Sequence, residues 1–229
     1  MSHVHFACSL QAGEFLFGKK EVLNGNVMLV HNSIDCAKYV YSFSVRDSML
    51  ATWGLKDCFV LGHIGRFVEE KNHSFLIDIF AKIKSVEPKA ILLLIGTGKL
   101  QNRIEERVVS LGLNDSVKFL GLRDDVFRLL QMIDVFVMPS LFEGLPITLV
   151  EAQAAGVPCV VSSNVPNDAC LIPDIYSSLS LQSSVNEWCD NILSYRGYSK
   201  RNMLSRMQNK GFDIVLSAQQ LQNWYLSLK

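Results

Sequence analysis

The chain has 229 residues, of which 49% are hydrophobic, and its 22 basic and 22 acidic side chains give a formal net charge of zero. This length suits one substantial core with terminal extensions better than two full domains. The balanced charge argues against a nucleic-acid partner, because such proteins carry an excess of positive charge on one surface.

The cysteines and histidines give no sign of a disulfide framework or a metal site. The six cysteines are scattered without a Cys-x-x-Cys pair, and the five histidines are dispersed. This spacing favours reduced thiols in a cytosolic protein. The sequence has no apolar run of membrane-spanning length and no basic-then-apolar leader at its N-terminus. We therefore expect a cytoplasmic protein without a bound metal.

The first 43 residues do not begin like a complete domain. Residues 5–9 and 27–30 have the composition of short strands, and a polar turn at 24–26 separates them. No helix of convincing length is expected before that turn.

From residue 44 onward, short apolar runs alternate with segments of helical periodicity. The expected strands are 59–64, 90–95, 117–120, 134–138 and 157–161, and the expected helices are 46–53, 75–86, 100–111, 126–132 and 147–155. This alternation predicts an α/β fold with a parallel sheet, right-handed crossovers and helices on both faces. A helical tail is expected over 184–229, with breaks near 196–197 and 210–211 and with Trp188, Ile192, Trp224 and Leu228 as packing residues.

The segment 139–158 places two glutamates eight positions apart, between a buried strand and a helix. Glu143 lies in the loop after the strand, where open parallel sheets bind ligands, and Glu151 lies among apolar residues of the helix. A carboxylate in that setting needs hydrogen-bond donors. A solvent-facing Glu151 is the plain structural alternative, and a general acid and base pair, as in glycoside hydrolases, is another.

Two further strand ends carry candidate ligand-binding residues. Gly65 and Arg66 end one strand, and Lys71 follows five residues later. A guanidinium and an ammonium in fixed positions suit a negatively charged ligand. Gly96 and Gly98 form a tight turn after the most apolar strand, but the third glycine of a dinucleotide fingerprint is absent.

These segments together resemble the signature of group-1 retaining glycosyltransferases of the bacterial polysaccharide-biosynthesis type, which use nucleotide sugars and have the two-Rossmann-domain GT-B architecture. The resemblance implies that Arg66 and Lys71 bind the donor diphosphate, Glu143 the sugar and Glu151 the ribose. It implies further donor contacts at Gly65, Gly96, Gly98, Gly121, Leu122, Arg123, Gly144, Leu145, Pro146, Thr148 and Leu149. The nucleotide sugar is then a substrate, and neither a cofactor nor a metal is expected.

The resemblance also implies a domain organisation. Residues 31–35 are similar to the family's interdomain linker, with Ser33 in place of a glycine. Residues 1–43 would then be the end of an acceptor domain plus the linker, and 44–229 the Rossmann-like donor-binding domain. The acceptor domain, or a separate partner chain, would be missing here, and through it the protein could associate with the inner face of the membrane.

The function implied is transfer of a hexose from a UDP- or GDP-sugar to a glycan or lipid-linked acceptor in surface polysaccharide synthesis. The chain alone would bind nucleotide and transfer little sugar. The alternatives are a non-catalytic nucleotide-binding partner subunit of a split glycosyltransferase, a GT-B nucleotide-sugar epimerase, and an NAD-dependent enzyme.

Overall fold

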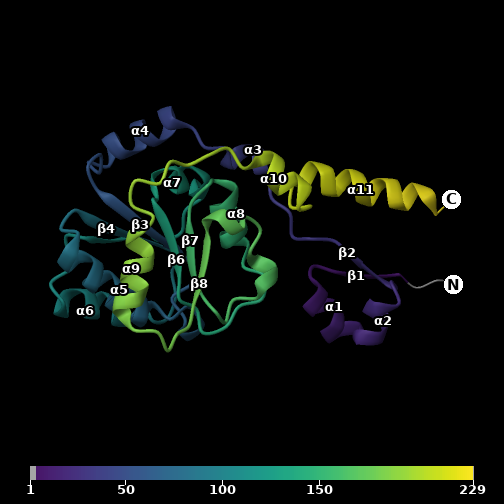
Figure 1. Ribbon diagram of the computed structural model, residues 1–229, viewed down its shortest axis with the longest axis horizontal. Helices are drawn as coiled ribbons and strands as arrows, with labels where there is room; N and C mark the ends of the chain where they lie inside the picture. The colour runs from purple at the N-terminus through teal and green to yellow at the C-terminus, as the bar shows by residue number, and fades with distance from the viewer. Residues whose placement is uncertain (1–3, 229) are drawn as a thin grey trace. The chain divides into compact units, whose positions relative to one another are not determined.

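Six parallel strands form the central sheet of the protein, shown in Figure 1. The computed structural model describes residues 4–228. The strands are β3 (Phe59–Ile64), β4 (Ala90–Ile95), β5 (Val117–Phe119), β6 (Val135–Met138), β7 (Cys159–Ser162) and β8 (Tyr176–Leu179), and they lie in the order β5-β4-β3-β6-β7-β8. Strands β4 and β5 therefore lie on one side of β3, and β6, β7 and β8 follow in order on its other side. The predicted parallel sheet is confirmed.

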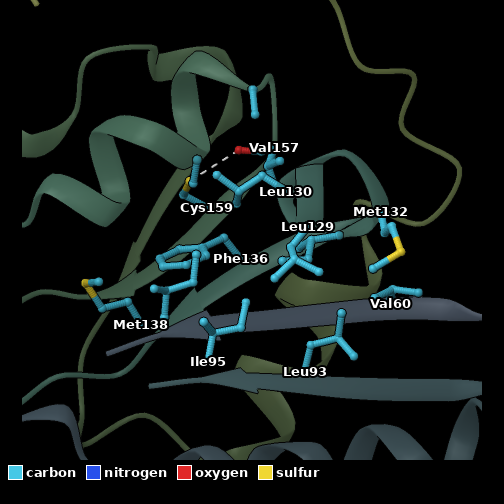
Figure 2. Packing of buried hydrophobic residues seen from close by; sticks show 14 of the residues in the cluster. Val60, Leu93, Ile95, Leu129, Leu130, Met132, Phe136, Met138, Val157 and Cys159 are labelled. Atoms are coloured by element: carbon cyan, nitrogen blue, oxygen red, sulfur yellow. Dashed lines mark hydrogen bonds between the residues drawn. The ribbon is translucent and has the colours of Figure 1, made fainter. Parts of the chain in front are cut away.

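Helices cover both faces of this sheet, also as predicted. They are α4 (Phe43–Thr52), α5 (His73–Val86), α6 (Gln101–Ser110), α7 (Val126–Met132), α8 (Ile147–Ala154) and α9 (Val185–Leu193). Successive strand residues point to opposite faces. Leu93 accordingly packs with residues of α4, α7 and α8, whereas its neighbour Leu92 packs with residues of α5, α6 and α9. Figure 2 shows the first of these two cores, where Leu93, Phe136 and Leu129 lie around the middle of the sheet.

Strand β8 and three short 3-10 helices were not expected from the sequence. The 3-10 helices are η1 (Glu69–Lys71), η2 (Asn167–Ala169) and η3 (Pro173–Ile175). Strand β8 reads Tyr-Ser-Ser-Leu, lies at the edge of the sheet and is only partly buried. It therefore lacks the apolar run by which the buried strands are recognised.

The chain divides into two compact units, which we describe separately. The larger unit is residues 39–203 and contains the six-stranded sheet. The smaller unit joins residues 4–38 to residues 204–228. Its elements are β1 (His5–Ala7), α1 (Leu10–Phe17), α2 (Lys19–Leu23), β2 (Val27–Leu29), α10 (Leu204–Asn209) and α11 (Ile214–Ser227), while α3 (Cys36–Tyr39) spans the boundary. Strands β1 and β2 pair in parallel.

The expectation that no substantial helix precedes residue 24 was wrong. Helix α1 has eight residues, and the Ser9 side chain accepts a hydrogen bond from the Ala12 amide at its start. Phe15 and Leu16 on this helix are largely exposed, so the segment lacks the one-sided apolar pattern that would have indicated it. A serine before the helix and Gly18 after it were the signals available.

The last two helices belong to the smaller unit together with residues 4–38, and the predicted domain boundary at residue 43 stays a prediction. Ile34 forms a parallel bridge with Asp213, and Phe6 contacts Trp224 edge to face. Ser33, at the position where a linker glycine was expected, bonds through Oγ to Ser217 Oγ at 2.7 Å. Leu228 does not pack as predicted, because it is largely exposed.

Within residues 4–228, none of the helices combines the length and the apolar composition needed to cross a membrane.

The middle of β3 yields a first test. A Cβ atom on Gly62 would lie 2.3 Å from Ile133 Cδ1, so we expect Gly62→Ala to destabilise the protein by about 1–3 kcal/mol through overpacking. Ile133→Ala removes the obstructing atoms, and the double variant should therefore lose less stability than the sum of the two single variants. Urea unfolding measures both effects.

Gly144→Ala is the matched control, because a Cβ there meets no atom within 4 Å and should change stability little. Additive losses for Gly62→Ala and Ile133→Ala would contradict the packing argument.

Candidate functional site

The candidate site lies where the carboxyl ends of β3 and β6 meet. These strands are neighbours in the sheet, and the direction of strand addition reverses between them. Loops after two such strands leave toward opposite sides, which makes this switch point the usual ligand site of an open parallel sheet. Gly65 and Arg66 follow β3, and Glu143 follows β6. The topology thus brings together residues that the sequence separates by more than seventy positions.

Lys71 and Glu143 form an ion pair across this switch point. Lys71 Nζ lies 2.5 Å from Glu143 Oε1, and Ser140 Oγ donates to the same oxygen at 2.7 Å. The Lys71 and Glu143 side chains are only 18% and 9% exposed. The Leu141 amide also donates to the Glu70 carbonyl at 2.7 Å and ties the two loops together. The pair is thus held in place and partly removed from water, where a charge–charge contact is stronger than at the surface.

Arg66 is an exposed cation of the site. Within residues 4–228, its side chain makes no hydrogen bond or ion pair with another residue. A guanidinium in that state keeps all of its donors for a ligand.

The glycines of the site are needed for close packing between loops. A Cβ on Gly96, whose φ is +133°, would lie 2.2 Å from the Gly65 carbonyl oxygen. A Cβ on Gly98 would come within 2.6 Å of the Phe67 backbone, and one on Gly65 would lie 3.0 Å from His63 Nε2. The loop after β4 is therefore packed directly against the loop after β3. This explains the Gly96 and Gly98 turn without a nucleotide, and their donor contact stays a prediction.

The loop after β5 joins the same backbone network. The Gly96 amide donates to the Gly121 carbonyl at 2.8 Å, and Gly121 has a φ of +63°. Leu122 is 79% exposed. Arg123 donates through Nε and Nη2 to the Asp125 carboxylate, at 2.8 Å each. The guanidinium of Arg123 is therefore already engaged, so Leu122 and the loop backbone are the groups left open to a ligand.

Helix α8 presents the remaining predicted residues. Pro146 occupies the position before the first helical residue, and no side chain of residues 4–228 caps this end. Gly144 is exposed, while Leu145 and Thr148 are partly buried. Leu149 is fully buried, and its amide donates to the Pro146 carbonyl, which leaves little of Leu149 for a ligand. The start of α8 thus offers uncapped amides, which favour an anion.

Glu151 lies one turn further along α8 and is partly buried. The Tyr39 hydroxyl donates to Glu151 Oε1 at 2.6 Å. Burial raises the pKa of the Glu151 carboxyl, and the hydrogen bond from Tyr39 opposes that rise. Glu151 therefore does not simply face solvent, because it is partly buried and its carboxylate has a specific donor.

Two buried histidines behind the site were missed by reasoning from the sequence. The rings of His63 and His73 meet edge to face at 4.7 Å, and His73 stacks on Phe67 at 4.2 Å. His63 Nδ1–H donates to the Val137 carbonyl at 2.8 Å, which leaves Nε2 without a partner. Burial lowers the pKa of His63 to about 4 and that of His73 to about 2. Neutral rings add no charge beside Lys71.

No group of three or more histidine, cysteine or acidic side chains suited to a metal ion occurs among residues 4–228. A cavity of about 250 Å³ does exist in the smaller unit, between β2 and the segment around α11, and its lining includes His31, Lys210 and Gln220. It contains none of the predicted site residues.

The buried histidines make stability dependent on pH. Each has a folded-state pKa below the ordinary 6.5, so only the unfolded chain takes up their protons as the pH falls below 6.5. Stability should therefore decrease from pH 7 to pH 5, by on the order of 1–2 kcal/mol for each histidine. Urea unfolding followed by tryptophan fluorescence measures this decrease.

His73→Leu should reduce the decrease, because it removes one of the two titrating rings. If His73→Leu shifted stability equally at pH 7 and pH 5, a neutral buried ring at this position would be contradicted.

Comparison with known proteins places the chain in a family. Residues 49–174 match the family model described as "Glycosyl transferases group 1". The chain is 35% identical to the putative glycosyltransferase EpsF of Bacillus subtilis (strain 168), over 96% of this chain and 58% of that protein. It is 26% identical to the UDP-Gal:alpha-D-GlcNAc-diphosphoundecaprenol alpha-1,3-galactosyltransferase of Escherichia coli, over 88% and 54% of the two chains.

Solved structures agree in fold. Anabaena Alr3699/HepE, solved with UDP and glucose, superposes with a TM-score of 0.80 at 22% identity, over 98% of this chain and 63% of that one. Sucrose-phosphate synthase from Thermosynechococcus elongatus superposes with a TM-score of 0.77 at 22% identity, over 97% and 57%. The chain spans a little over half the length of the curated relatives named above. With the family model matched over more than half of its residues, the chain belongs to the group 1 glycosyl transferases.

Proposed function

We propose that this chain binds the nucleotide-sugar donor of a retaining hexosyltransferase. The reaction moves a hexose from a UDP- or GDP-sugar to a glycan or lipid-linked acceptor in surface polysaccharide synthesis. The observation that carries the proposal is the Lys71–Glu143 pair at the β3/β6 switch point, with Arg66 exposed beside the same strand end.

The charges of the site suit a diphosphate that becomes a leaving group. Cleavage of the bond between sugar and diphosphate leaves negative charge on phosphate oxygens, and preset cations stabilise that charge as it develops. Arg66 offers a fork of donors and Lys71 a single ammonium. The uncapped start of α8 adds backbone N–H groups, whose partial positive charge also favours a phosphate. Charge compensation is therefore assigned to protein groups, and the proposal requires no divalent cation.

The two glutamates are assigned to hydroxyl groups. Glu143 Oε1 accepts hydrogen bonds from Lys71 Nζ and Ser140 Oγ. In the proposed complex, the other carboxylate oxygen therefore faces the sugar hydroxyls. Glu151, on the helix that follows, is assigned to the ribose. Hydrogen bonds from hydroxyls to ionised carboxylates are about twice as strong as neutral ones, which suits both positions.

The relatives support a nucleotide-sugar donor. The Escherichia coli relative is named as a UDP-Gal-dependent galactosyltransferase, and HepE was solved with UDP and with UDP-glucose. Because the chain spans a little over half of those relatives, we assign acceptor binding to an N-terminal acceptor domain or a partner chain. The proposed location is the cytoplasm, with membrane association through the acceptor side.

Glu151→Ala tests the ribose assignment. We expect wild-type chain to bind UDP or GDP in isothermal titration calorimetry and Glu151→Ala to bind about tenfold or more weakly, because a charge-assisted hydrogen bond is lost. Equal affinity of the two proteins for both nucleotides would refute the ribose assignment. Tighter binding of NAD than of either nucleotide would favour a different enzyme class.

Glu143→Gln serves as the comparison in the same experiment. Loss of the Glu143 carboxylate should weaken the binding of UDP-glucose or GDP-mannose. It should leave the binding of UDP or GDP unchanged or make it tighter, since Lys71 is released from its carboxylate partner. A similar loss for nucleotide and nucleotide sugar would contradict the sugar assignment of Glu143.

Lys71→Met tests the diphosphate assignment. We expect affinity for UDP to fall on the order of tenfold to a hundredfold, while the weak affinity for uridine stays unchanged, because only UDP carries the phosphates. Lys89→Met is the matched control, since Lys89 is exposed and precedes β4 at the opposite end of the sheet. If Lys71→Met lowered the affinities for UDP and for uridine equally, the substitution would have damaged the site as a whole rather than removed a phosphate contact.

A further inference from the structure

Glu151 has only one of its two carboxylate oxygens engaged. The Tyr39 hydroxyl donates to Oε1 at 2.6 Å, and no other residue among 4–228 donates to Oε2. We propose that Tyr39 is a positioning residue, which fixes the Glu151 carboxylate so that Oε2 accepts a hydrogen bond from a ribose hydroxyl of the nucleotide. This inference rests on the proposed function, and it assigns a role to a residue outside the segments that pointed to the donor site.

Tyr39 is itself held in place. It packs against the core on the α7 and α8 side of the sheet. The side chain of Gln131, buried in α7, accepts a hydrogen bond from the Ser42 amide at 3.0 Å and lies 3.4 Å from the Tyr39 carbonyl through Nε2. The segment after α3 is therefore anchored to α7 at both ends. A donor fixed in this way keeps its geometry whether or not a ligand is present.

The end of α7 that anchors this segment is also fixed. Arg46 Nη1 donates to the Gln131 and Met132 carbonyls, and Lys200 Nζ donates to the Leu130 and Gln131 carbonyls at 2.8 and 2.9 Å. Arg46 and Lys200 thus satisfy the last carbonyls of the helix. Gln131, Tyr39 and Glu151 then form a continuous chain of contacts from a rigid helix to the candidate ribose site.

The chemistry of the hydrogen bond between Tyr39 and Glu151 suits a positioning role for Tyr39. A glutamate carboxylate rotates readily about its last bond, so without a donor its two oxygens exchange places. A bond to Oε1 selects one orientation and also favours the ionised form, which is the form that accepts from a hydroxyl. Supporting contacts that orient the residues touching a ligand are worth about tenfold to a hundredfold at metal sites, and a smaller effect is expected for one neutral donor.

A double-mutant cycle with two nucleotides tests the inference. Titration calorimetry on the full 229-residue chain would compare wild type, Tyr39→Phe, Glu151→Ala and the double variant, each with UDP and with 2′,3′-dideoxy-UDP. We expect Tyr39→Phe to weaken UDP binding about threefold to thirtyfold and to leave the dideoxy nucleotide unaffected. In the Glu151→Ala background, Tyr39→Phe should have no further effect on UDP.

Tyr41→Phe is the matched control, because Tyr41 lies on the same segment but its ring faces Lys200 at 5.6 Å. Unchanged UDP binding in Tyr39→Phe would overturn the inference while leaving the Glu151 assignment intact. Equal losses for UDP and the dideoxy nucleotide would also overturn it, since they would show a purely structural role. Tighter UDP binding would overturn it by showing that the hydroxyl competes with the ribose. Unchanged UDP binding in Glu151→Ala would overturn the ribose assignment and the inference together.

Discussion

The reversal of strand order between β3 and β6 is the constraint on which the site depends. Both strands are buried on both faces, so their backbone groups must pair within the sheet, and their side chains must be covered by helices. Right-handed crossovers then place the helices that follow β3 and β6 on opposite faces. Helix α5 packs on one core and helix α8 on the other. The loops that lead to them leave the sheet edge side by side, and Lys71 meets Glu143 there.

The surrounding loops are fixed by backbone contacts rather than by side chains. Gly96 lies against Gly65, Gly98 lies against Phe67, and Gly96 bonds to Gly121. A Cβ atom at Gly96 or Gly98 would lie 2.2 or 2.5 Å from a backbone oxygen of the facing loop, so a side chain at either position would force the loops apart. The backbone bond from Leu141 to Glu70 likewise ties the loop of Glu143 to that of Lys71, which holds the two charges together. Preorganised charges of this kind need little rearrangement when charge develops on a substrate.

Much of this arrangement could be predicted from the sequence, and the exceptions have physical causes. The buried strands are unbroken apolar runs, and residues at their carboxyl ends were assigned to the site for that reason. The edge strand β8 and helix α1 were missed because both are partly exposed and lack periodicity. The contact of Tyr39 with Glu151 joins residues 112 positions apart through a single hydroxyl, and no local pattern indicates it. The two histidines looked dispersed because only the fold brings their rings together.

The charge pairs of the site bear on how the proposed donor binds. Of the three cations predicted to bind the donor, Lys71 is paired with Glu143 and Arg123 with Asp125, so Arg66 is the one left without a carboxylate. The histidines behind Lys71 stay neutral and contribute no further charge. In the proposed complex, the diphosphate therefore meets Arg66 first, at the exposed edge of the site. It then shares Lys71 with Glu143, whose second carboxylate oxygen stays available to the sugar hydroxyls in the same proposal. Under this proposal, the ammonium group of Lys71 links the diphosphate to the glutamate assigned to the sugar.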